Sequence, residues 1–97
     1  MSNGRRDREK DFLKLIGLSG ITFILRYLNE HDSGQYTDFQ EYINAHSLNQ
    51  RLRSLLHFNL IEYHYVRNKK KREWYTLTEE GKKVLMYMKN IIRLTED

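Results

Sequence analysis

Five of the six residues between positions 67 and 72 are cations, the densest positive charge in the chain. They are Arg67, Lys69, Lys70, Lys71 and Arg72. Clustered cations bind polyanions, because each phosphate that they neutralise releases condensed counterions. Lysines at the tip and edge of a hairpin also prevent strand-to-strand aggregation. That second explanation accounts for one or two lysines more easily than for five cations, so we expect a polyanion partner here.

The charge of the whole chain is distributed unevenly. Its net charge is +4, but residues 1–50 carry 6 basic and 7 acidic side chains, whereas residues 51–97 carry 11 basic and 6 acidic side chains. The positive excess therefore lies in the second half. Such asymmetry indicates a polyanion, most often nucleic acid, although a solvated surface with clustered charge is the simpler alternative.

Other classes of chemistry have little support in the sequence. The 97 residues suit one domain, and the chain has no cysteine, which excludes disulfides and thiolate metal sites. The four histidines lack metal-ligand spacing. No nucleophile with a base, and no glycine-rich phosphate loop, can be assembled. We therefore expect no enzyme, no metal, no cofactor and no small-molecule ligand.

The N-terminus lacks a secretory signal, and no apolar run reaches the roughly 20 residues that span a bilayer. We expect a cytoplasmic, nucleoid-associated protein that does not contact a membrane.

The elements that must position these residues begin with two helices. Residues 1–10 are polar, and we expect them to be flexible. A short helix over residues 12–16 follows, and residues 17–20 interrupt it. We expect Ser19 to cap a second helix, because an apolar stripe follows it at helical spacing, namely Ile21, Ile24, Leu25 and Leu28.

A pair of helices comes next. Residues 35–36 suggest a very short strand, after which Thr37 is expected to cap a helix over residues 38–44. A tight turn leads to Ser47, the expected cap of a helix over residues 48–58. This pair has the outline of a helix-turn-helix. The apolar side of its second helix gathers Leu48, Leu52, Leu55 and Leu56.

After Asn59 the apolar period changes from 3.6 to 2, which predicts strands over residues 60–67 and 73–77. Thr78 is expected to cap a last helix over residues 79–94. The predicted fold is therefore α+β, a single winged-helix domain over residues 1–97. It combines a three-helix core containing the helix-turn-helix, a two- to three-stranded antiparallel wing and a C-terminal helix.

Four segments in this order resemble winged helix-turn-helix transcription regulators. They read ILRYL (24–28), YTDFQEYI (36–43), LNQRLRSLLHFNLIE (48–62) and REWYTLTEEGKKVL (72–85). The resemblance is to the HxlR and MarR-like groups, including small archaeal and archaeal-virus regulators. Asn59 replaces the glycine that usually ends the recognition helix, and asparagine tolerates the left-handed conformation required there. The sensing cysteine of some HxlR-type members is absent.

The resemblance implies that the second helix of the pair enters the major groove of DNA. The candidate contacts on this chain are Ser47, Asn49, Gln50, Arg51, Arg53, Ser54 and His57. Arg53 suits a bidentate contact to guanine, and Asn49 and Gln50 suit adenine. Arg51 is expected to reach phosphate or to pair locally. The alternative interpretation is an ordinary exposed helix face, which is also polar.

The resemblance also makes residues 67–72 the wing tip, where the five cations fit phosphate or minor-groove contact. The nearby aromatic residues are expected to pack mostly as core residues or as cross-strand pairs, with base stacking disfavoured. They are Tyr63, Tyr65, Trp74 and Tyr75.

In related regulators the terminal helices form a twofold dimer. Both terminal helices of this chain carry surplus apolar residues. A small domain that cannot bury them alone gains stability by pairing them with those of a second copy. The predicted interface comprises Phe12, Leu13, Ile16, Leu85, Met88, Ile91 and Ile92. The alternative is that these stripes pack against each other within one chain.

The sequence therefore predicts a homodimeric transcription regulator that binds specific double-stranded DNA. Two alternatives remain: a winged-helix module for protein–protein interaction, and a non-specific DNA or RNA binder.

Overall fold

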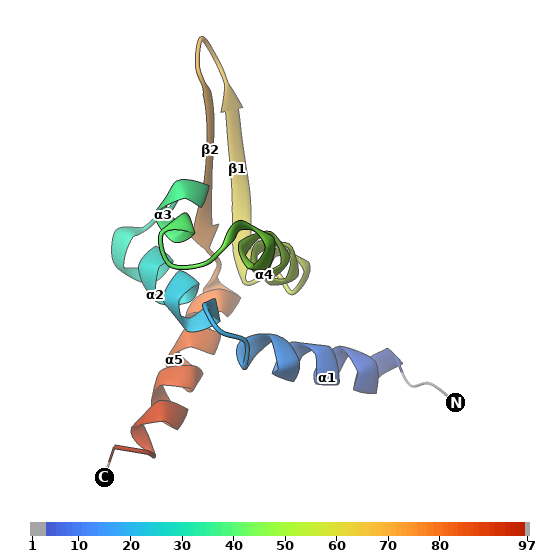
Figure 1. Ribbon diagram of the computed structural model, residues 1–97. Helices are drawn as coiled ribbons and strands as arrows, with labels where there is room; N and C mark the ends of the chain where they lie inside the picture. The colour runs from blue at the N-terminus through green and yellow to red at the C-terminus, as the bar shows by residue number, and fades with distance from the viewer. Residues whose placement is uncertain (1–3, 97) are drawn as a thin grey trace.

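The computed structural model describes residues 4–96. In that part of the chain five helices and two strands follow one another, namely α1 (Gly4–Ile16), α2 (Ile21–His31), α3 (Tyr36–Gln40), α4 (Ala45–His57), β1 (Ile61–Arg67), β2 (Lys71–Leu77) and α5 (Glu79–Arg93). Helices α3 and α4 form the helix-turn-helix, and β1 with β2 forms the wing (Figure 1). The predicted α+β winged helix is confirmed.

The core lies where α2, α4 and the base of the wing meet. The predicted stripe of α2 is fully buried, and α4 adds Leu48, Leu52 and Leu55 to the same core. Phe39 of α3 and Leu85 of α5 close it from two further sides. Leu56 was expected on this apolar side, but its side chain is 37% exposed. It projects toward the wing because it lies on the flank of α4, away from the buried leucines.

The wing is a two-stranded antiparallel hairpin. Its register pairs Ile61 with Leu77 at the base and Arg67 with Lys71 at the tip, so residues 68–70 form the turn. The very short strand expected over residues 35–36 is absent. In its place Gly34 forms a single antiparallel bridge to Tyr75. The Tyr75 N–H donates a 2.8 Å hydrogen bond to the Gly34 carbonyl, and the Gly34 N–H donates a 3.0 Å hydrogen bond to the Tyr75 carbonyl.

Three predicted helix caps are wrong, because other residues form the turns. The N-cap of α2 is Gly20, with φ +88°, and not Ser19. An added Cβ there would lie 2.6 Å from Cδ1 of Ile43. Helix α3 begins at Tyr36 and not after Thr37, since the Asp38 carboxylate accepts a 2.7 Å bond from the Gln35 N–H.

Helix α4 also begins earlier than predicted. Asn44 is its N-cap, and Asn44 Oδ1 accepts a 3.0 Å hydrogen bond from the Ser47 N–H. Asn is as good an N-cap as Ser, so the choice between Asn44 and Ser47 is not decided by residue type alone. The consequence is that Ala45 and His46 belong to the first turn of α4.

Helix α1 corrects the expectation for the N-terminus. Residues 4–10 were expected to be flexible but are helical, whereas residues 1–3 lie outside the described part of the chain. Arginine, lysine and glutamate favour helices intrinsically. The Arg8 guanidinium also lies 4.7 Å above the Phe58 ring, which ties this part of α1 to the end of α4.

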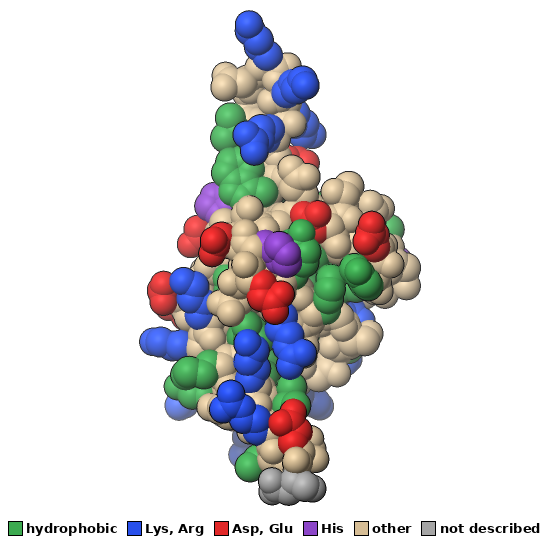
Figure 2. Space-filling model, turned by 90° about the vertical axis from the view of Figure 1, so that its left-hand side faces the viewer, with side chains coloured by type: hydrophobic (Ala, Val, Ile, Leu, Met, Phe, Trp, Pro, Cys, Tyr) green, Lys and Arg blue, Asp and Glu red, His purple; other side chains and the backbone are tan. Residues whose placement is uncertain are grey.

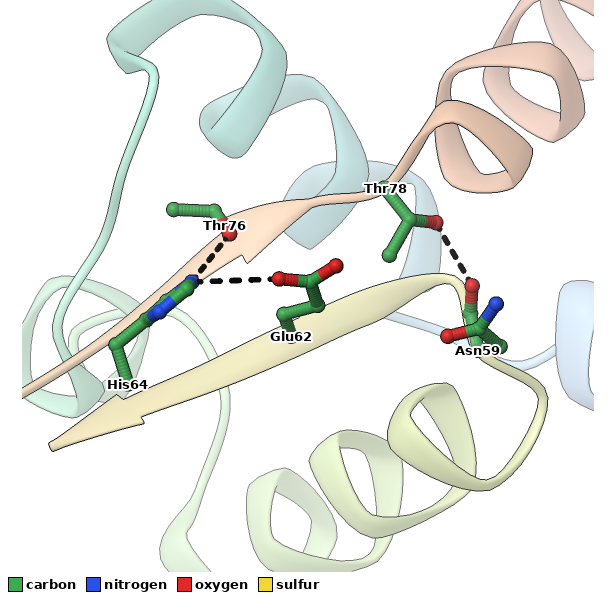
Figure 3. Close-up of polar contacts among 5 residues, drawn as sticks. All are labelled: Asn59, Glu62, His64, Thr76 and Thr78. Carbon is green, nitrogen blue, oxygen red and sulfur yellow. Dashed lines mark hydrogen bonds and ion pairs between the residues drawn. The ribbon is translucent and has the colours of Figure 1, made fainter.

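A polar junction joins the end of α4, the base of the wing and the start of α5. Asn59 has φ +58°, which confirms the predicted left-handed conformation. The Thr78 hydroxyl donates a 2.7 Å hydrogen bond to the Asn59 carbonyl (Figure 3). The same oxygen accepts from the Gly81 N–H at 2.9 Å, so Thr78 caps α5 as predicted.

Candidate nucleic-acid interface

Helix α4 is held firmly on its inner side. Three buried leucines fix its rotation, and the Asn44 cap fixes its start. Arg51 Nε donates a 3.1 Å hydrogen bond to the carbonyl of Ser19, in the loop before α2. Arg51 therefore pairs locally, which is one of the two roles that the sequence left open, and its side chain is half-buried.

The outer side of α4 is polar and accessible. Asn49, Gln50, Arg53 and His57 are exposed, whereas Ser47 and Ser54 are half-buried at the flanks. The structure thus brings the four exposed candidates onto one face. A helix with such a face, fixed in rotation by its buried side, can present amide and guanidinium groups to base edges.

His46 is a residue of this face that the sequence interpretation missed. Its side chain is exposed, and His46 Nε2 lies 3.5 Å from Gln50 Nε2 one turn later. It was missed because residues 44–46 were expected to form a turn. The available signal was Asn44, since a helix that starts directly after it places His46 beside Gln50.

The five wing cations are all exposed. Figure 2 shows blue Lys and Arg side chains concentrated at the outer end of the hairpin. Lys71 Nζ lies 3.8 Å from a Glu73 carboxylate oxygen and 6.0 Å from the centre of the Tyr65 ring. Arg72 Cζ lies 5.9 Å from the centre of the Trp74 ring. The wing tip is therefore a projecting cluster of charge, of which two members also contact neighbours on the strands.

The wing aromatic residues form cross-strand pairs, as the sequence predicted. The Tyr63 and Tyr75 rings lie 5.4 Å apart, and the His64 ring stacks on Trp74 at 5.3 Å. His64 Nε2 also lies 2.7 Å from Thr76 Oγ1 and 3.8 Å from a Glu62 carboxylate oxygen (Figure 3). These contacts stiffen the hairpin that carries the cations.

A second polar pair lies on the other face of the hairpin. The Tyr63 hydroxyl donates a 2.5 Å hydrogen bond to Glu73 Oε1. This bond stabilises the protonated phenol and raises the pKa of Tyr63 to about 12. Burial raises the pKa of Tyr75, which packs beside it. The bond to Glu73 thus holds the Tyr63 hydroxyl in its protonated, donating form.

Helix α4 has a hollow on each flank. A hollow of about 540 Å³ lies toward the wing and is lined by Gln35, Tyr36, Thr37, Leu56, Tyr63, Glu73 and Tyr75. A larger hollow of about 730 Å³ lies toward α1. Its lining includes Gln50, Arg53, Ser54 and His57 from α4, together with Asp11 and Lys14 from α1.

The predicted dimer residues divide into three groups by exposure. Leu13 and Ile91 are each 61% exposed and Ile92 is 36% exposed, while Phe12, Ile16 and Met88 are half-buried. Leu85 is only 2% exposed in the chain's own core, so it offers no area to a partner and its assignment is corrected. Helices α1 and α5 leave the body in different directions (Figure 1), so their apolar stripes do not cover each other.

Within residues 4–96, no group of three or more His, Asp or Glu side chains is arranged to hold a metal ion. No helix in the described part of the chain is long and apolar enough to cross a membrane.

Comparison with known proteins agrees with this geometry. The model of the HxlR-like helix-turn-helix family matches residues 17–97. The transcriptional regulator YodB from B. subtilis, in its reduced form, has a similar structure, with a TM-score of 0.75 over 89% of this chain and 86% of that chain. The two sequences are 19% identical, so this likeness concerns the fold. Comparison with curated protein sequences gives no match.

Proposed function

Because the chain belongs to the HxlR-like helix-turn-helix family of DNA-binding transcription regulators, we propose that it binds a specific double-stranded site as a homodimer. Helix α4 lies in the major groove, and the wing lies on the backbone or in the adjacent minor groove. Two half-sites about one helical turn apart, ~34 Å, form a pseudo-palindrome.

One observation carries this proposal: a hydrogen-bonded junction joins the helix with the exposed polar face, α4, to the base of the cationic wing. The Thr78 hydroxyl bonds to the Asn59 carbonyl where α4 leads into the wing. A helix in the major groove thereby fixes where the wing cations fall. Base-edge contacts by Gln50 and Arg53 then supply sequence preference, and the wing supplies affinity that does not depend on sequence.

The homodimer is supported by apolar residues that the fold leaves uncovered. On α5, Tyr87 is 57% exposed and Ile91 61% exposed. On α1, Leu13 is 61% exposed. A twofold dimer buries the same patch on both copies, and its symmetry is repeated in the DNA site. Repression by covering a promoter is the simplest mechanism, and activation uses the same contacts.

Selection of bound duplexes from a random pool tests specificity and symmetry together. We expect an enriched motif with two inverted half-sites spaced by about one helical turn. Enrichment of one unrepeated half-site contradicts the homodimer. Binding without enrichment leaves a non-specific binder, and no binding at any salt concentration leaves a protein-interaction module.

A further inference from the structure

Helix α1 contacts the C-terminal end of the helix that we place in the major groove. The Phe12 ring meets the Phe58 ring edge-on at 5.2 Å, and Arg8 covers the same ring. Leu15 is 3% exposed and belongs to the core. These contacts fix α1 against the C-terminal end of α4, so the polar residues of α1 have defined positions relative to α4.

Two of those polar residues face the outer side of α4. Asp11 and Lys14 line the same 730 Å³ hollow as Gln50, Arg53 and His57. Both are exposed, and neither has an ion-pair partner among residues 4–96. The proposed base-reading residues of α4 therefore share this hollow with a cation, Lys14, and an anion, Asp11, from α1.

The geometry of DNA indicates which part of a duplex would lie next to this hollow. The major groove is about 12 Å wide, so a helix lying in it has one phosphate backbone on each flank. Leu56 faces the hollow on the wing side of α4, and Ser54 faces the hollow on the α1 side. In Figure 1 the hairpin extends above α4, whereas α1 lies below α4 and runs sideways away from the body. If the wing contacts one backbone, then α1 lies on the flank of α4 that the other backbone would follow.

We propose that α1 is a third DNA-contacting element, in which Lys14 binds a backbone phosphate on the side of α4 opposite the wing. Asp11, in the same hollow, repels that backbone and limits the affinity. The proposal rests on the proposed placement of α4 in the major groove. It concerns a helix outside the family match, which begins at residue 17.

This role is compatible with the dimer residues of α1. Leu13 does not line the hollow and is exposed elsewhere on the helix. One face of α1 is thus available to a second copy of the chain, while Lys14 faces the DNA. The helix therefore has room for both contacts at once.

Charge variants measure the contact directly. We expect Lys14→Gln to weaken binding about fivefold at low salt, as for loss of one exposed charge pair, and to reduce the slope of log affinity against log salt by about 0.9. Lys10→Gln is the matched control, because Lys10 is exposed on α1 outside the hollow. Asp11→Asn should shift affinity and slope in the opposite direction. Equal effects of Lys14→Gln and Lys10→Gln would overturn the assignment to the hollow.

The absence of native cysteine allows a positional test. Lys14→Cys and Lys69→Cys each create one attachment point for an iron chelate that cleaves nearby DNA backbone. We expect cleavage from position 14 and from position 69 on opposite flanks of each half-site. No cleavage from position 14, or coincident cleavage from both positions, contradicts the proposal.

The two proposals fail in different ways. If wild-type protein does not bind duplex DNA, the proposed function fails. If it binds with specificity, and probes on the wing cleave, but changes at Lys14 and Asp11 alter neither affinity nor slope, then only the role of α1 fails. Circular dichroism of each variant, compared with wild type, identifies a loss that comes from unfolding.

Discussion

Gly81 shows how one residue holds α4, the wing and α5 together. A Cβ at this position would lie 2.1 Å from the carbonyl oxygen of Leu60, at the start of the wing. The same carbonyl accepts a 3.1 Å hydrogen bond from the Thr78 N–H. The first turn of α5 is therefore pressed against the backbone that leads from α4 into the wing, and only glycine permits this approach.

Replacing Gly81 with alanine should destabilise the protein, although alanine ordinarily favours a helix over glycine by about 1 kcal/mol. We expect a loss of about 1–3 kcal/mol in the free energy of unfolding, because backbone must move to admit the methyl group. Urea denaturation measures this change.

Gly17→Ala is the matched control for this prediction. An added Cβ at Gly17 would lie 3.6 Å from the carbonyl oxygen of Leu13, which is an ordinary van der Waals contact. We expect a change within about 0.5 kcal/mol there. Equal stability of the Gly81 and Gly17 variants would show that the close approach at Leu60 does not constrain the junction.

At this scale the sequence predicted the residues whose role is fixed by local backbone. Asn59 and Thr78 are of this kind, since a left-handed residue and a helix cap need few distant contacts. The caps at Ser19 and Ser47 were wrong because Gly20 and Asn44 compete for the same turns. Tertiary contacts decide between them, such as the packing of Gly20 on Ile43.

Among the elements, the wing combines a stiff stem with a charged tip. Cross-strand ring pairs occupy the stem, and the cations occupy the three-residue turn and its two flanking pairs. A stiff stem lowers the entropy lost when the tip meets a backbone. The wing is therefore suited to contribute affinity in the same way to every duplex.

Changing Lys69, Lys70 and Lys71 together to glutamine should weaken binding to all duplexes similarly. The slope of log affinity against log salt should fall by about 0.9 for each lysine that contacts a phosphate. Fluorescence anisotropy between about 50 and 200 mM salt measures both quantities.

A control for the wing variant is the triple change of Lys82, Lys83 and Lys89 to glutamine, which removes the same charge from α5. If the two triple variants behave alike, only net charge matters. If the wing variant leaves affinity and slope unchanged, these lysines serve solubility.

Elements with a clear period were predictable, and those set by distant packing were not. The alternation after Asn59 predicted both strands, although β2 begins two residues before the predicted Glu73. The short strand over residues 35–36 was wrong because Gly34 pairs with Tyr75, a contact between segments 41 residues apart. Nothing in the sequence of α1 indicates that Lys14 lines the same hollow as Arg53, since that depends on the Phe12–Phe58 contact.

At the scale of the whole molecule, α1, α5 and the wing extend from a small core (Figure 1). The radius of gyration is 14.7 Å, whereas a compact domain of this length has about 13 Å. Projecting helices with exposed Ile91 and Leu13 are costly for a monomer and favourable for a dimer. The sequence indicated surplus apolar residues, but it did not indicate that Leu85 would be buried in the chain's own core.

Reading of base sequence by α4 is tested most directly by the ratio of affinities for the selected duplex and a shuffled duplex. Each bidentate contact contributes about 1–3 kcal/mol of discrimination. We expect Gln50→Ala with Arg53→Ala to lower the ratio at least about tenfold, with little change for shuffled DNA.

The matched control for this measurement is Arg26→Ala with Gln40→Ala, which removes the same residue types from exposed positions of α2 and α3. We expect this control to keep the wild-type ratio while the α4 variant loses most of it. A ratio that is unchanged in the α4 variant would contradict base reading by Gln50 and Arg53.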